Sequence, residues 1–357
     1  MDHRETEERP RSTRGSHVAG GASFPLRWLG RVGSGLVGHL NGTVPGPVLI
    51  TLTAFIGITY ALGSVAWGGN EWADPPPEIA VEEVAFDLVE VRLPVHVNDR
   101  VERWIRRFLT TERADFEHYL AREGLYGGMI RDRLRQRGMP EGLIYLAMIE
   151  SGFSPWATSP VLASGVWQFL RPTAQAYGLR VDQWVDERRD PVRATDAALD
   201  YLAELYEEFG SWHLAAAAYN AGPGRVGSAL RRVQPGTVDH DELYWEIIEH
   251  LPRETREYVP KLIAAAILAE QAEHFGFDVE PDLPYLFELV LVPGGTALAQ
   301  VAGAAGVPNS LMRDLNPHMI RGTTPPDGSF LVRVPLGTSG QVVAAHAAPG
   351  GGAVMRP

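Results

Sequence analysis

The sequence predicts a mainly α-helical protein with a small β-α-α-β module near its C-terminus. Apolar residues recur at helical spacing through residues 191–209, and two shorter apolar runs each end close to a glycine, which is typical of buried helices. After residue 285 the pattern changes to two strand-like segments that enclose two short helical ones. A chain of 357 residues is long enough to form both parts.

The composition narrows the classes of function. A net charge of -12 argues against a nucleic-acid partner, because phosphate contacts require basic surfaces. The chain has no cysteine, which excludes disulfides, thiolate metal sites, cysteine nucleophiles and lipid attachment through cysteine. The 11 histidines lack a metal-ligand spacing, so we predict neither a metal nor a cofactor. The basic residues are arginine nearly throughout, with Lys261 the only lysine, and we interpret this preference as genome composition bias rather than as a binding signal.

The N-terminal part predicts a membrane segment. Residues 1–45 are rich in Arg, Glu, Gly and Ser and are predicted to be a disordered cytoplasmic segment. Within 46–68, a stretch of 20 residues carries no charge and is long enough to cross a bilayer. Arginines precede it and acidic residues follow it, so the positive-inside rule leaves the N-terminus in the cytoplasm. The alternative is a signal segment cleaved near Ala66, which would release the remainder.

Further elements follow in order along the chain. Residues 69–90 contain three consecutive prolines and predict a stiff linker. The domain at 91–280 begins with helices that are expected to break at Tyr126-Gly127-Gly128. Asp190-Pro191 should open a long helix that ends at Gly210, and Ser211 should cap the next one. A last apolar helix is predicted over 261–274.

Glu150 is the most informative residue, because it ends the apolar run 143–149 and precedes the helix stop at Gly152. Apolar surroundings and the negative end of the helix dipole both disfavour a carboxylate, so we expect a raised pKa for Glu150. A carboxylic acid that is neutral near pH 7 suits general-acid cleavage of a glycosidic bond. An isolated glutamate in this position more often turns to solvent or pairs with an arginine, so its neighbours matter.

Three segments follow Glu150-Ser-Gly-Phe in order: Gly-Val-Trp-Gln-Phe at 165–169, Ala-Ala-Tyr-Asn-Ala-Gly at 217–222 and Glu-Thr-Arg-Glu-Tyr-Val at 254–259. Together they resemble the lysozyme-like lytic transglycosylases, in particular the membrane-bound type D branch, over roughly residues 91–335. The resemblance implies a goose-type/soluble lytic transglycosylase helical domain. It also implies peptidoglycan glycan strands as the partner and a location at the periplasmic face of the inner membrane, or in the periplasm after cleavage.

The resemblance also implies a reaction. In this family the glutamic acid protonates the glycosidic oxygen between N-acetylmuramic acid and N-acetylglucosamine. The same carboxylate then deprotonates the muramyl C6 hydroxyl, which closes a 1,6-anhydro ring. Most glycosidases use two carboxylates, yet residues 151–181 contain none, although Asp182, Asp186 or Glu187 could fold back. Two alternatives stay open: a hydrolysing muramidase on the same fold, and an inactive peptidoglycan-binding scaffold.

Five residues are predicted to bind substrate. Ser151 can hydrogen-bond the acid or the sugar, or it can cap its helix. Gln168 carries a donor and an acceptor that suit acetamido groups, whereas its neighbour Trp167 is expected in the core. The tyrosines match segments that line the family's cleft, although each alone would be read as a core residue. The set is Ser151, Gln168, Tyr219, Asn220 and Tyr258.

Residues 285–337 resemble the LysM wall-binding module in a degenerate form. The order is β-α-α-β, and Gly294-Gly295-Thr296 stands where the module has Gly-Asp-Thr. A long insertion at 323–328 also departs from the module. Both carbohydrate binding and a purely structural role remain open for it. The Ala-, Gly- and Pro-rich segment 338–357 is predicted to be a disordered tail.

Overall fold

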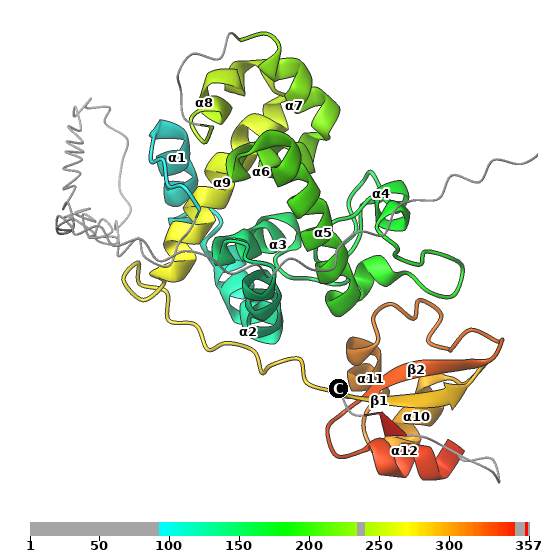
Figure 1. Cartoon of the computed structure of the whole chain (residues 1–357). Helices are drawn as coiled ribbons and strands as arrows, with labels where there is room; N and C mark the ends of the chain where they lie inside the picture. The colour runs from blue at the N-terminus through cyan, green and yellow to red at the C-terminus, as the bar shows by residue number, and fades with distance from the viewer. Residues whose placement is uncertain (1–92, 234–239, 347–353, 356–357) are drawn as a thin grey trace, which may run out of the picture. The chain divides into compact units, whose positions relative to one another are not determined.

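The computed structural model describes residues 93–233, 240–346 and 354–355 (Figure 1). All of them belong to the second of two compact units, which spans residues 85–357. The predicted cytoplasmic segment, membrane segment and linker at 1–45, 46–68 and 69–90 lie outside the described residues. Among the helices that are described, none combines the length and the apolar character that crossing a membrane requires.

The first part of this unit is helical, which confirms the predicted fold class. Helix α3 packs against α2 and α9, and α6 packs against α5 and α9, so α9 contacts both helices that carry predicted site residues (Figure 1). The α-helices are α1 (Asp99–Leu109), α2 (Arg113–Gln136), α3 (Ile144–Ser151), α4 (Arg171–Ala176), α5 (Pro191–Phe209), α6 (Trp212–Ala221), α7 (Pro223–Leu230), α8 (Leu243–Ile247) and α9 (Arg253–Glu270).

Local signals set the ends of α5 and α6 as predicted. The Asp190 side chain accepts hydrogen bonds from the first backbone N–H groups of α5, and Ser211 accepts one from the first turn of α6. Gly210 ends α5 in the left-handed conformation that glycine adopts without strain. Trp167 is fully buried and its ring N–H donates to Thr195 Oγ1 at 2.9 Å, so the prediction that it is a core residue is confirmed.

The predicted helix break at Tyr126-Gly127-Gly128 is wrong, because α2 continues through it. Each glycine inside a helix costs about 1 kcal/mol relative to alanine, but Tyr126 and Ile130 are buried on the same helix and offset that cost. A third glycine of α2, Gly124, is required by close packing. A Cβ on Gly124 would lie 2.3 Å from the backbone oxygen of Asp282, so the chain that follows α9 runs directly against α2.

The C-terminal part forms the predicted β-α-α-β order and then adds a helix and a short strand. The antiparallel sheet has the order β2-β1-β3, and Val290 and Val332 lie in its own apolar cluster. The predicted disordered tail at 338–357 is corrected at its start, because α12 forms there and buries Val342 fully. The elements are β1 (Glu288–Pro293), α10 (Leu298–Ala305), α11 (Asn309–Leu315), β2 (Ser329–Val334), α12 (Ser339–His346) and β3 (Val354–Met355).

Buried polar contacts join this part to the start of α5. The Arg333 guanidinium donates to both carboxylate oxygens of Asp190, at 2.8 and 2.7 Å. His318 lies 3.6 Å from the same carboxylate, and burial lowers its pKa to about 4, so the imidazole is neutral at pH 7. Asp190 therefore has two roles, because it caps α5 and also pairs with the buried Arg333.

Candidate active site

Glu150 lies in the last turn of α3, behind six buried residues of the same helix. Gly152 ends the helix with φ 56°, and a Cβ at this position would lie 2.2 Å from the Tyr119 ring. Glycine is therefore required for two reasons, conformation and space. The stop predicted from the sequence is confirmed, and it holds Glu150 at the end of a rigid apolar helix.

Helix α9 brings Tyr258 to Glu150. The Tyr258 hydroxyl donates to Glu150 Oε1 at 2.6 Å. Pro260 lies inside α9 and has no N–H, so the carbonyl of Arg256 loses its helical donor. The buried Tyr244 hydroxyl supplies a replacement bond to Arg256 O at 3.2 Å, which supports α9 at the turn that carries Tyr258.

The surroundings of Glu150 favour its neutral form, in the direction that the sequence predicts. Burial raises its pKa to about 7 and is the largest cause. The hydrogen bond from Tyr258 and the charge of Lys261 act in the opposite direction, while Glu254 raises the pKa again. Burial and the nearby Glu150 raise the pKa of Tyr258 well above its ordinary value, so its phenol remains a donor at neutral pH.

The C-terminal end of α6 contributes Tyr219 and Asn220 to the same region. The Tyr219 hydroxyl donates to the backbone oxygen of Trp167 at 2.8 Å, and burial and the charge of Glu150 raise its pKa. Asn220 donates to Glu254 Oε1 at 3.3 Å and accepts from the Thr255 hydroxyl at 2.8 Å. The ends of α3, α6 and α9 thus meet through their polar side chains.

Ser151 and Gln168 are bound within the loop that follows α3. The Ser151 hydroxyl donates to the backbone oxygen of Val166 at 2.8 Å and accepts from the backbone N–H of Ser154 at 3.1 Å. Gln168 adopts φ 48°, and its amide nitrogen donates to Gly165 O at 2.8 Å and to Ala157 O at 3.2 Å. Because the amide N–H groups point into the loop, the side-chain carbonyl oxygen is the part of Gln168 that suits a ligand.

The three downstream carboxylates that could have folded back are held elsewhere by salt bridges. Each pairs with an arginine close to it in the sequence: Asp182 with Arg180 at 2.5 Å, Asp186 with Arg188 at 2.7 Å and Glu187 with Arg193 at 3.0 Å. Asp182 also accepts two backbone N–H bonds, which lower its pKa despite the opposing effect of desolvation. None of the three is therefore positioned by its contacts as a partner of Glu150.

Sequence reasoning missed two charged residues of this region, Glu254 and Lys261. The Lys261 ammonium donates to the backbone oxygen of Ile149 at 3.1 Å, directly before Glu150. The composition of the chain gives no reason to expect this contact of Lys261. The signal was present, because Glu254, Tyr258 and Lys261 follow the i, i+4, i+7 spacing that places side chains on one face of a helix.

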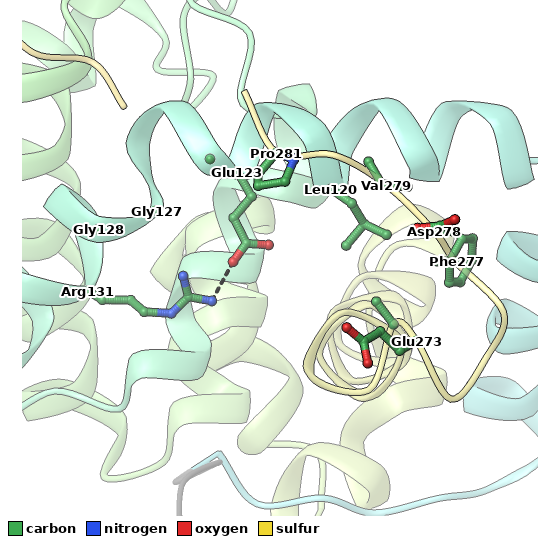
Figure 2. A pocket seen from close by; sticks show the side chains of 12 residues that line it. Leu120, Glu123, Gly127, Gly128, Arg131, Glu273, Phe277, Asp278, Val279 and Pro281 are labelled. Carbon is green, nitrogen blue, oxygen red and sulfur yellow. Dashed lines mark hydrogen bonds and ion pairs between the residues drawn. The ribbon is translucent and has the colours of Figure 1, made fainter. Parts of the chain in front are cut away.

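A cavity of about 390 Å³ lies elsewhere, beside α2 and the chain that follows α9 (Figure 2). Glu123 and Arg131 form an ion pair in its wall, and none of the predicted site residues lines it. Arg131 also donates to the Tyr145 hydroxyl at 3.3 Å, and Tyr145 in turn donates to Glu270. This network links α2, α3 and α9, so it braces the helix that carries Glu150.

Comparison with known proteins finds two matching domains. Residues 129–240 match the Transglycosylase SLT domain, and residues 287–350 match the LysM-like domain described for the lytic transglycosylase MltD. In both matched domains the chain is similar to the MltD-like lytic transglycosylases. The predicted resemblance to this family, including a LysM-like C-terminal module, is thereby confirmed.

Individual relatives cover different shares of the chain. The membrane-bound lytic murein transglycosylase D of Escherichia coli K12 is 31% identical over 268 residues, which is 74% of this chain and 58% of the relative. The soluble lytic murein transglycosylase of the same strain is 26% identical over 55% of this chain and 26% of its own length. A solved inactive mutant of the lytic transglycosylase Slt from Pseudomonas aeruginosa is 26% identical over 43% of this chain and 24% of its own, with a TM-score of 0.34.

The raised pKa of Glu150 predicts a pH-dependent stability. Its pKa rises from 4.5 to about 7, so the folded protein binds this proton more tightly than the unfolded chain. The stabilisation is complete below pH 4.5 and is lost as the pH rises through 7. Relative to wild type, Glu150→Gln should therefore gain about 1–3 kcal/mol in free energy of unfolding between pH 4.5 and pH 8. Urea unfolding at several pH values measures the gap, and a gap independent of pH would contradict the argument.

Proposed function

We propose that this chain is a peptidoglycan lytic transglycosylase in which Glu150 acts first as the acid and then as the base. The observation that supports this most strongly is the half-buried Glu150 carboxyl, which accepts a hydrogen bond from Tyr258 and has a pKa of about 7. A group with this pKa is present in both protonation states at neutral pH, so it can donate a proton in one step and accept one in the next.

The reaction consumes no water. Glu150 donates its proton to the glycosidic oxygen between N-acetylmuramic acid and N-acetylglucosamine, and the bond from the muramyl C1 to this oxygen breaks, with help from the substrate's own acetamido group. The Glu150 carboxylate then takes the proton of the muramyl C6 hydroxyl, and O6 bonds to C1 to form the 1,6-anhydro ring. Because the nucleophile belongs to the substrate, its positioning supplies a large part of the rate.

The other predicted residues hold the substrate and the acid in this proposal. Tyr258 keeps the Glu150 carboxyl oriented, since its hydroxyl bonds Oε1 directly. The side-chain carbonyl of Gln168 would accept from an acetamido N–H, while Ser151 and Tyr219 support the surrounding loop through the backbone oxygens of Val166 and Trp167. Asn220 would act together with Glu254, to which it is hydrogen-bonded.

The position of Glu254 favours considering a second function, hydrolysis of the glycosidic bond. Glu254 is close enough to Glu150 to raise its pKa, so this region holds a second carboxylate. A carboxylate that activates a water molecule would make the protein a hydrolysing muramidase on the same fold. Glu254 is exposed and shares its contacts with Asn220, which favours a role in substrate binding over activation of a buried water molecule.

Product analysis separates the two reactions. Purified sacculi are digested with the full chain, and the released muropeptides are analysed by mass spectrometry. We expect 1,6-anhydromuramyl ends, which are lighter than hydrolytic ends by one water molecule. Predominantly hydrolytic ends that disappear in Glu254→Gln would instead support the muramidase, and no released product would support the inactive scaffold.

We also propose that residues 46–68 anchor the protein in the inner membrane with its catalytic part on the periplasmic side. The uncharged stretch within these residues and the arginines that precede it support this orientation. The length of the stretch favours a retained anchor over a cleaved signal segment. Peptidoglycan strands would then lie within reach of the catalytic part.

A further inference from the structure

Lys261 occupies a defined position at the end of α3. Its ammonium donates to the backbone oxygen of Ile149 at 3.1 Å, and it lies 5.5 Å from the centre of the Trp104 ring. The last carbonyl groups of a helix have no partners within the helix, and a positive charge there is favourable. Trp104 is fixed in turn, because its ring N–H donates to Glu257 of α9 at 3.0 Å.

The charges around Lys261 come from α9, α3, the end of α1 and the start of α2. Glu254 lies on α9 itself, Glu150 lies on α3, and Arg107 and Glu112 come from the end of α1 and the start of α2. The groups around Glu150 are Lys261, Glu254, Tyr258 and Tyr219. Within these two sets, Lys261 is the cation whose charge lowers the pKa of Glu150. Its hydrogen bond to the backbone oxygen of Ile149 also holds the end of α3, the helix that carries Glu150.

We propose that Lys261 is a positioning residue of the candidate active site, which holds the end of α3 and supplies the charge that balances the acid and base states of Glu150. This inference rests on the proposed function. A buried carboxyl without a nearby cation would favour its neutral form more strongly and would donate its proton less readily. A cation in direct contact would bind the carboxylate tightly and would weaken it as a base. Lys261 instead bonds the backbone oxygen of Ile149, the residue before Glu150, so its charge favours the carboxylate less strongly than direct contact would.

The pH dependence of kcat/KM tests the charge. The wild-type activity should fall as the pH rises through about 7, because Glu150 must be protonated in the free enzyme. In Lys261→Met the fall should move to higher pH by about one unit, and kcat should decrease. In Lys261→Arg the charge remains, so the fall should stay at the wild-type pH. A Lys261→Met profile that falls at the wild-type pH would overturn the proposal and leave only a structural role.

A second measurement requires neither a variant of Lys261 nor substrate. Because the full chain contains a single lysine, labelling with ¹³C-lysine gives one side-chain NMR signal set to follow from pH 5 to pH 9. We expect its Cε shift to change with a midpoint near pH 7 as Glu150 ionises, and the change to vanish in Glu150→Gln. A flat titration overturns the coupling. Coupling without any release of anhydromuropeptides would instead refute the proposed function and leave the Lys261–Glu150 interaction standing.

Discussion

Glu150→Gln is expected to lower the release of anhydromuropeptides from sacculi by about 10²- to 10⁴-fold, the range typical of a general acid-base group. An amide has nearly the shape of the carboxyl group and can still accept the hydrogen bond that Tyr258 donates to Oε1. It cannot donate a proton to the glycosidic oxygen or accept one from the C6 hydroxyl. The loss should therefore appear in kcat, with binding of glycan strands retained.

The matched control applies the same chemical change to a surface residue. Glu246 of α8 is exposed, so Glu246→Gln should digest sacculi at the wild-type rate. Circular dichroism of both variants establishes that the helices are intact. If Glu150→Gln retains activity within about tenfold of the control, Glu150 does not act as the general acid and another group must supply the proton.

Gly165→Ala should destabilise the protein by about 3–5 kcal/mol, the sum of a left-handed backbone penalty and a steric clash. Gly165 has φ +84°, and a Cβ at this position would lie 1.7 Å from the backbone oxygen of Arg188. Because backbone atoms on both sides would have to move, a change of rotamer brings no relief. The carbonyl of Gly165 also holds the Gln168 side chain, so activity should fall with stability.

Gly178→Ala separates the two contributions to that cost. Gly178 also has a positive φ, +77°, but a Cβ there would meet no atom within 4 Å. Its substitution should therefore cost only the backbone penalty of about 1–2 kcal/mol. Urea unfolding measures both variants, and equal losses would mean that the loop beside Arg188 adjusts freely. In that case Gly165 would not fix the position of Gln168.

Several features of the fold could be read from short segments, because the interactions that cause them are local. Asp190 and Ser211 cap helices through N–H groups two or three residues away, and Gly152 and Gly210 end helices by their own conformation. The apolar run before Glu150 is also a local signal, because apolar residues on every side of a helix indicate that the helix is buried. The predicted raised pKa of Glu150 followed from that burial, which is also its largest cause in the structure.

The errors arose where a distant segment decides what a residue does. Tyr126-Gly127-Gly128 predicted a helix break, whereas α2 continues through these residues. The nearby Gly124 allows close contact with Asp282, more than 150 positions away. The start of the tail looked disordered until packing of Val342 gave α12 a core to join.

The sequence by itself determined that an acidic residue stands at the tip of a buried helix, because hydrophobic spacing and helix-ending glycines act over a few residues. Only the tertiary structure decided what surrounds that acid. Packing of α9 against α3 brings Tyr258 to its oxygen and Lys261 to the preceding carbonyl, across more than 100 residues of chain. Electrostatic effects on a buried group depend on distance in space, which helix packing sets and which local sequence patterns do not encode.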